Sequence, residues 1–178
     1  QHSTFAGSYP SFETRTLNTL SVVDYALNGT QTVDNTLTYY DLTTSGGGTK
    51  TAGGAFSLAA DGTLNVSAGV FDPSTYLVTG GGTNTLTVAD GATLKVNNST
   101  FALNYSSGFT TYNFDSNSTI EYSGSGDQTI KGDVEMGYLV ISGSGTKSLS
   151  ATTTTATTTI SGGTLDATAS NYDLYADS

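Results

Sequence analysis

One short stretch of this chain occurs twice: LTTSGGGTK at residues 42–50 returns as LVISGSGTK at residues 139–147. The same offset of 97 residues pairs Tyr25 with Tyr122, so the match extends well beyond the two stretches. Self-similarity at a long fixed period is typical of proteins built from stacked structural repeats. We therefore expect the repeat, rather than a single thick globular core, to organise the fold.

The repeat divides the chain into two copies of one unit. Copy one is expected at about residues 3–98, and copy two, which is incomplete, at about residues 99–178. The offset grows to 101 where GTL at residues 62–64 matches GTL at residues 163–165. Neither end reads as the polar cap that repeat proteins need for solubility, so we expect one continuous array that continues in a longer protein or meets neighbouring subunits.

A shorter period lies inside the long one. Leu42, Leu64 and Leu86 are each 22 residues apart, and Leu139 and Ile160 are 21 apart. Apolar and polar residues alternate around these positions, which predicts strands with one buried and one solvated face. We therefore predict an all-β fold, a β-solenoid (parallel β-helix) with coils of about 22 residues. The three leucines should form one buried column, and Leu139 should stack on Ile160.

The length of the repeat leaves a second architecture open. A unit of 97 to 101 residues is close to the size of an immunoglobulin-like domain, so tandem immunoglobulin-like β-sandwiches are the alternative. Two observations favour the solenoid: the chain has no Trp for a sandwich core, and a 22-residue period is not expected in that fold.

Composition and charge exclude several classes of partner. Five Lys and Arg against fifteen Asp and Glu give a net charge of −10, which repels phosphate backbones and anionic lipid surfaces. We expect no nucleic-acid partner. No apolar run approaches the length needed to cross a bilayer, so no membrane insertion is expected. The absence of cysteine removes disulfides and thiolate metal sites.

The titratable residues offer little for catalysis. His2 is the single histidine and lies beside the N-terminus, where a solvated tail residue is expected rather than a catalytic base. Lys50 and Lys147 occupy one repeat position, and Asp24 and Glu121 occupy another, which favours a scaffold role for all four. We expect no enzymatic activity and predict no catalytic, cofactor-binding or metal-ligating residue.

Calcium is the ion that this chain is best suited to bind, since acidic turns offer hard oxygen ligands. GSGD at residues 124–127 resembles part of a calcium-binding repeat. The equivalent residues 27–30 of copy one contain no Asp, and a ladder of ions would keep its ligand in both copies. The sequence therefore assigns no residue to a metal, and no cofactor is expected.

Three stretches carry a resemblance to a known class of proteins. YSGSGDQTI at 122–130, LVISGSGTKSL at 139–149 and GTLD at 163–166 resemble repeats of very large secreted bacterial surface proteins. Those proteins are adhesin-like, rich in Thr and Gly, and similar in style to filamentous haemagglutinin solenoids. The resemblance implies secretion and a role at the cell surface or in the extracellular matrix, and it carries over no catalytic residue. Copy one departs from the pattern at residues 26–28.

We therefore expect a structural or adhesive component of a cell surface or extracellular filament. Its partners would be further copies of itself, associated end to end, together with a glycan or a host or matrix surface. The alternative is a glycan-binding surface module, because exposed aromatic side chains can stack on sugars. The tyrosines expected to be exposed for that purpose are Tyr39, Tyr40, Tyr105 and Tyr112.

Overall fold

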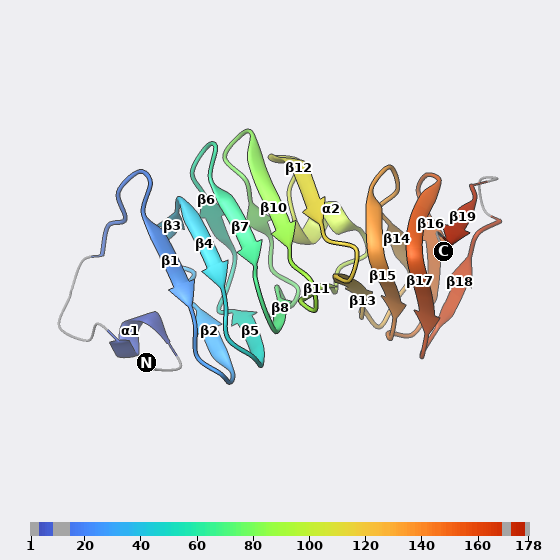
Figure 1. Ribbon diagram of the computed structural model, residues 1–178, viewed down its shortest axis with the longest axis horizontal. Helices are drawn as coiled ribbons and strands as arrows, with labels where there is room; N and C mark the ends of the chain where they lie inside the picture. Colours follow the sequence, from blue (N-terminus) through green and yellow to red (C-terminus); the bar gives the residue numbers. More distant parts are fainter. Residues whose placement is uncertain (1–3, 9–14, 169–171, 177–178) are drawn as a thin grey trace.

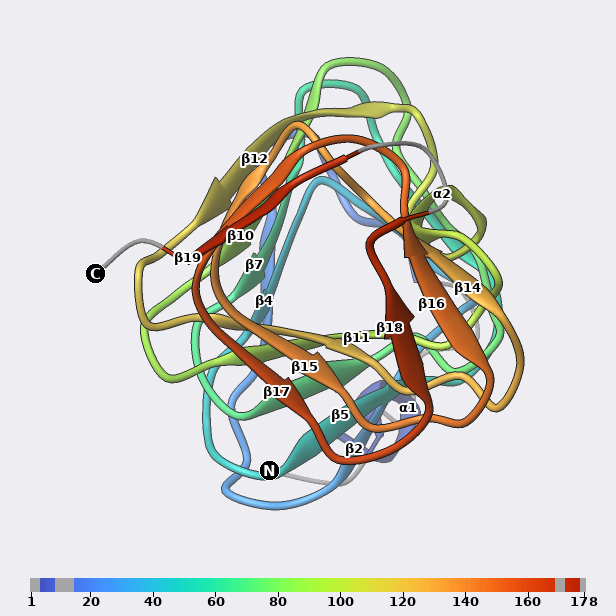
Figure 2. The same ribbon diagram turned by 90° about the vertical axis from the view of Figure 1, so that its right-hand side faces the viewer.

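The computed structural model describes residues 4–8, 15–168 and 172–176. The chain winds as a β-solenoid of about 8 turns with coils of about 20 residues, which confirms the predicted fold class. Viewed along the axis, the coils enclose a triangle (Figure 2), so each coil contributes to three faces of a rod (Figure 1). Thr and Val favour this structure because β-branched side chains suit the pleated, half-buried surface of a strand.

The three faces are parallel sheets. Face 1 holds β1 (Val22–Tyr25), β4 (Asp41–Thr44), β7 (Thr63–Val66), β10 (Asn84–Val88) and β12 (Phe109–Phe114), in that spatial order. Face 2 is formed by the longest sheet, and its order runs β2 (Gln31–Val33), β5 (Thr49–Ala52), β8 (Val70–Asp72), β11 (Thr93–Val96), β13 (Thr119–Tyr122), β15 (Glu135–Ile141), β17 (Thr153–Ile160), β19 (Leu174–Ala176). The last of these strands, β19, pairs with the start of β17 and lies on the side of face 1 (Figure 2).

Face 3 consists of two short sheets. One contains β3 (Thr38–Tyr39), β6 (Phe56–Leu58) and β9 (Val78–Thr79), and the other contains β14 (Gln128–Ile130), β16 (Thr146–Leu149) and β18 (Thr164–Asp166). The helix α2 (Phe101–Asn104) lies between them, since Val78 bridges to Tyr105 and Thr100 bridges to Thr129.

The predicted leucine column is confirmed on face 1. Leu42 lies beside Leu64, and Leu64 beside Leu86, in the register of β4, β7 and β10. All three side chains are 0% exposed. Every strand pair formed by the described residues is parallel, so the tandem immunoglobulin-like sandwich, which needs antiparallel pairs, is excluded.

The predicted stacking of Leu139 on Ile160 is wrong. Leu139 lies beside Thr158, while Ile160 lies beside Ile141 and is 52% exposed. The reason is that this coil closes at Thr158, earlier in the chain than the leucine spacing predicts. Residues 153–160 are mostly Thr and form the long strand β17.

Coil length varies with the corners that the chain must turn. The coil that carries Lys147 onto Leu165 is short, whereas the coil that carries Leu86 onto Tyr112 is long. The strands themselves are short, so the difference lies mainly in the corners and in the insertion of α2. The coil length that the leucines predict therefore applies to one part of the rod.

The second copy repeats the elements of the first, shifted by one face. The path from Val23 to its equivalent Ile120 passes four coils on face 1 and then turns onto face 2. Accordingly β1 on face 1 corresponds to β13 on face 2, and β2 on face 2 corresponds to β14 on face 3. The match of residues 62–64 with 163–165 does not follow this shift, because β7 lies on face 1 and β18 lies on face 3, two faces further round.

Short helices recur at matching places. The helix α1 (Phe5–Ser8) is preceded by Thr4, which bridges to Thr32 of β2, just as Thr100 before α2 bridges to Thr129 of β14. Neither helix in the described part of the chain is long and apolar enough to cross a membrane.

Candidate functional site

Two lysines lie inside the solenoid. Lys50 is 0% exposed, and its Nζ donates to the carbonyl oxygens of Leu27, Gly29 and Gly47 at 2.8, 3.0 and 2.8 Å. These oxygens belong to successive turns at one corner of the rod. The ammonium group is therefore held by backbone dipoles, which compensate the removal of its charge from water.

Lys147 repeats this arrangement one face further round. It is also 0% exposed, and its Nζ donates to the carbonyl oxygens of Gly124, Gly126 and Ser144 at 3.0, 2.6 and 2.5 Å. Each acceptor lies 97 residues after an acceptor of Lys50. The shared repeat position therefore corresponds to a shared scaffold contact in the two copies.

Burial lowers the pKa of both lysines from the usual value, because desolvation penalises the charged form. A nearby carboxylate opposes this shift in each case, Asp24 for Lys50 and Asp127 for Lys147. Neither lysine has a solvent-accessible surface from which it could act on a ligand.

Buried Asn and Gln side chains also donate hydrogen bonds to backbone carbonyl oxygens at other corners of the rod. The side-chain nitrogens of Asn84, Asn104 and Gln128 each donate to two backbone carbonyl oxygens at 2.6–3.1 Å. The side-chain oxygen of Gln128 also accepts the N–H of Gly124 at 3.1 Å. These amides were not among the residues singled out from the sequence, although the repeat relation between Gln31 and Gln128 was a signal for them.

The acidic repeat positions make matching contacts on the outside. Ser45 donates its hydroxyl to Asp24 at 2.7 and 2.9 Å, and Ser142 donates to Glu121 at 2.5 Å. These side chains link neighbouring coils.

The turn that resembles a calcium loop is filled by protein groups. Asp127 accepts the N–H of Thr146 at 2.8 Å, while the carbonyl oxygens of Gly124 and Gly126 accept the ammonium of Lys147. Within residues 4–8, 15–168 and 172–176, no three side chains of the His, Cys, Asp or Glu type come close enough to hold a metal ion. His2 lies outside the described residues.

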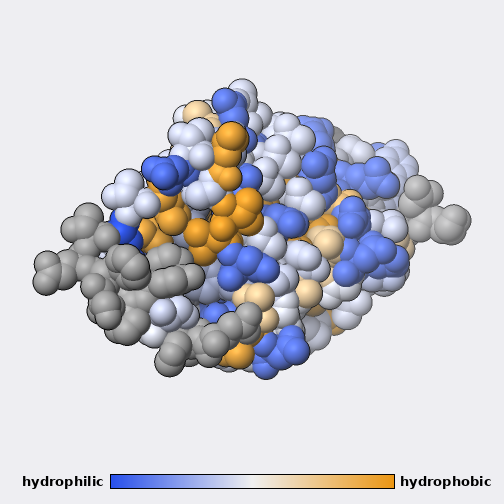
Figure 3. Space-filling view, turned by 60° about the vertical axis from the view of Figure 1, so that its left-hand side comes forward, coloured by the Kyte–Doolittle hydropathy of each residue, from blue (hydrophilic) through white to orange (hydrophobic). Residues whose placement is uncertain are grey.

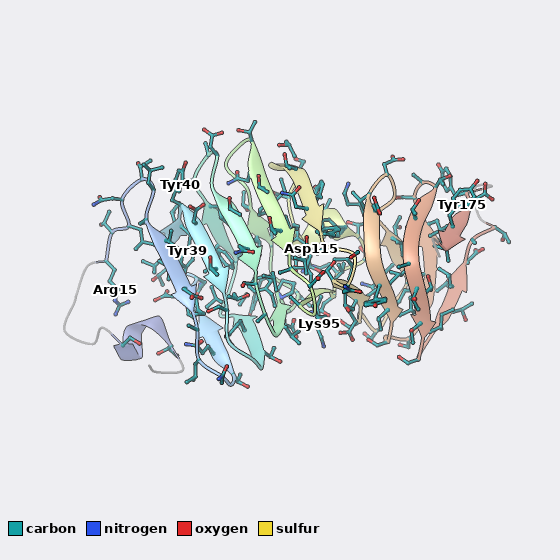
Figure 4. The ribbon with its side chains drawn as sticks, in the orientation of Figure 1. Arg15, Tyr39, Tyr40, Lys95, Asp115 and Tyr175 are labelled. Atoms are coloured by element: carbon teal, nitrogen blue, oxygen red, sulfur yellow. The ribbon has the colours of Figure 1, made fainter. Side chains whose placement is uncertain are left out.

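The tyrosines expected at the surface have different environments. Tyr39 and Tyr105 are 0% and 1% exposed, so the expectation that they offer ring faces to a glycan is wrong. Tyr39 points inward because it lies on the buried side of β3, and Tyr105 is the residue that ends α2. Their hydroxyls donate to the carbonyl oxygens of Asp34 and Lys95 at 2.7 Å each. Tyr40 follows Tyr39 on the outer side (Figure 4).

Tyr112 is the half-buried member of this group, and it borders a cavity. The cavity has a volume of about 530 Å³ and is lined by Phe101, Tyr105, Phe109, Tyr112 and Lys131. We call this cavity the β12 cleft. Small side chains and hydroxyl groups complete its lining, from Thr100, Ala102, Ser107, Thr110, Thr129 and Ser150.

The ring of Tyr112 is held in place by a hydrogen bond and by its neighbours. Its hydroxyl donates to the carbonyl oxygen of Phe109 at 2.7 Å. Its ring meets that of Phe101 edge to face at 5.8 Å between centroids, and that of Phe114 at 5.9 Å. Lys131 lies over the ring, with Nζ 4.6 Å from the centroid. These contacts fix the orientation of the ring, so little side-chain freedom would be lost on binding.

No protein-family model, curated protein or solved structure matches this chain. The function must therefore be argued from the solenoid and its surfaces.

Proposed function

We propose that this protein is a structural and adhesive component of a cell surface or extracellular filament, in which solenoid segments associate end to end. The observation that carries the proposal is the outer edge of β1. It is the terminal strand of face 1 among the described residues, so one side of its backbone has no strand partner there. Such an edge is a template for pairing with another chain.

The side chains at this end favour association. Leu20 and Val22 are 72% and 64% exposed, and Figure 3 displays apolar side chains gathered at the N-terminal end of the rod. At the opposite end Ile160 and Tyr175 are 52% and 55% exposed. A contact between unlike ends is heterologous and need not close, so it would produce a filament rather than a ring.

Secretion and a bacterial surface location belong to the same proposal. They are supported by the resemblance of the Thr- and Gly-rich repeats to large secreted surface proteins, and by the parallel solenoid that these repeats form. A rod whose backbone groups are hydrogen-bonded between neighbouring coils, and which has few charged side chains, suits a load-bearing or adhesive layer.

Sedimentation velocity over a range of concentrations, with electron microscopy of the same samples, tests end-to-end association. The protein should form longer species as its concentration rises. Val22→Lys should suppress them, because a lysine on an edge strand opposes pairing. Leu103→Lys is the matched control: Leu103 is 52% exposed but lies in α2, far from β1. A protein that stays monomeric at every concentration would overturn the proposal.

Glycan binding is a second candidate function, and the β12 cleft favours it. The ring of Tyr112, whose orientation is fixed by its neighbours, lies beside several hydroxyl groups. It offers a stacking surface together with hydrogen-bond partners. Binding of the labelled protein to an array of immobilised glycans tests this candidate, and an array without a single retained glycan would reject it.

A further inference from the structure

The β12 cleft forms because the wall of the solenoid opens beside β12. Tyr112 and Phe114 continue the inner columns of Leu86 and Val88 in the register of β10 and β12. Leu86 and Val88 are 0% exposed, whereas both aromatic residues are only partly buried. No strand in the described part of the chain pairs with the far edge of β12. Tyr112 and Phe114 are therefore partly accessible from solvent at this point.

Lys131 places a positive charge at the opening. Its ammonium nitrogen lies 4.6 Å from the ring centroid of Tyr112 and 6.0 Å from that of Phe101. Among residues 15–168, the ion pairs formed by cationic side chains are those of Arg15 with Asp34 and of Lys95 with Glu121. The charge of Lys131 thus has no carboxylate partner there, although the protein as a whole carries a net charge of −10.

Copy one contains the same contact in a neutralised form. At the offset of 97 residues, Tyr112 corresponds to Arg15 and Lys131 corresponds to Asp34. Arg15 and Asp34 form an ion pair, with Nη1 and Oδ2 3.5 Å apart. In copy two a ring replaces the arginine and a lysine replaces the aspartate, so the pair gains an aromatic surface and an uncompensated positive charge. This difference between the copies is what a site for an anionic ligand requires.

We propose that the β12 cleft binds one carboxylated sugar residue of a glycan, with the sugar ring against Tyr112 and the carboxylate against the ammonium group of Lys131. A volume of about 530 Å³ lies within the usual range of small-ligand pockets. The hydroxyls of Thr110, Thr129 and Ser150 lie around the cleft and can pair with those of the sugar. Charge-assisted hydrogen bonds from Lys131 would select the acid over its neutral form.

The groove next to the cleft limits the ligand to a single acid. A second cavity of about 630 Å³ shares Thr110 and Tyr112 with the β12 cleft and is also lined by Asp115, Asp133 and Glu135. These carboxylates would repel a neighbouring acidic sugar. The ligand is therefore expected to carry one carboxylated residue flanked by neutral sugars, and a polymer of acidic sugars is expected to bind less well. The proposal rests on the glycan-binding candidate and does not depend on filament formation.

The first test is an array that presents glycans with one uronic or sialic acid residue, each beside its carboxyl-reduced form and beside a polyuronate. The protein should retain singly acidic glycans in preference to both comparisons. Retention of the reduced forms at equal strength would overturn the role of Lys131. An array with no retained acidic glycan would overturn the proposal. Binding of an extended peptide in the β12 cleft in place of a sugar would also overturn it.

Calorimetry with the strongest glycan then tests the residues. Lys131→Met should weaken binding by about tenfold or more, and Lys131→Arg should retain most of it, since the charge is kept. The double variant Tyr112→Arg with Lys131→Asp installs the pair of copy one and should abolish binding. Unchanged affinity in Lys131→Met would contradict the proposal. Circular dichroism establishes that each variant is folded. Sedimentation should be unaffected, because the cleft lies away from β1, so the two proposals can fail separately.

Discussion

Replacing Lys147 by Met tests whether the buried lysines hold the corners of the solenoid. Met keeps most of the side-chain volume but removes three hydrogen bonds, which join Nζ to the carbonyl oxygens of Gly124, Gly126 and Ser144 at 2.5–3.0 Å. Each carbonyl left without a partner costs about 1 kcal/mol or more, so the free energy of unfolding should fall by about 3 kcal/mol. For a chain of this size that loss lowers Tm by roughly 6–12 °C.

Chemical denaturation and differential scanning calorimetry measure this loss, and the chain offers a matched control. Lys95 carries the same side chain on the surface, where it is 27% exposed and lies 3.8 Å from Glu121. Lys95→Met should cost less than about 1 kcal/mol, as exposed ion pairs contribute little. Lys50→Met should lower the free energy of unfolding by as much as Lys147→Met, since equivalent carbonyl oxygens surround the two ammonium groups. If Lys147→Met were no more destabilising than Lys95→Met, the hydrogen bonds between Lys147 and the carbonyl oxygens would not stabilise the protein.

Three further predictions concern the core and its polar groups. Leu64→Ala should lower the free energy of unfolding by about 2–5 kcal/mol in urea titrations, because Leu64 lies inside the column, whereas Ile160→Ala should change it by less than about 1 kcal/mol. Gly143→Ala should lower Tm, because an added Cβ would overlap the carbonyl oxygen of Gly124, and an unchanged melting curve would contradict the close approach of these coils. Burial raises the pKa of Tyr105 and Tyr122, so their contribution to stability is complete below about pH 10 and is lost as the pH rises further. The part of the tyrosinate absorbance that Tyr105→Phe and Tyr122→Phe remove should therefore rise together with unfolding, as followed by circular dichroism, and ionisation of these tyrosines in the folded protein near pH 10 would disprove it.

The candidate site could be predicted only in part. Tyr112 was named as a residue for glycan recognition, but Tyr39 and Tyr105 were named with it and both are buried. A tyrosine in an alternating pattern has the same sequence signature on either face of a strand. Lys131 was not singled out at all, because its importance depends on contacts with Tyr112 and Phe101, which follow from the path of the chain around α2.

The corner residues illustrate a second limit. Repetition of Lys50 and Lys147 indicated a scaffold role, and the structure adds the physical reason, which is a cage of carbonyl oxygens around each ammonium group. A sequence cannot reveal burial of a lysine from its charge, since such side chains are almost always exposed. The cage requires turns from neighbouring coils to converge.

The sequence by itself determined the strands, the parallel solenoid and the column of Leu42, Leu64 and Leu86, because alternation and a constant spacing are properties of neighbouring residues. Only the tertiary structure decided which face each strand joins. That choice depends on the summed lengths of all the corners, so a coil shorter than the leucine spacing moved Ile160 from the column of Leu139 to that of Ile141. For the same reason the two copies are related by four coils and one further face. The tertiary structure also decided that β12 ends its sheet, which leaves Tyr112 and Phe114 only partly buried.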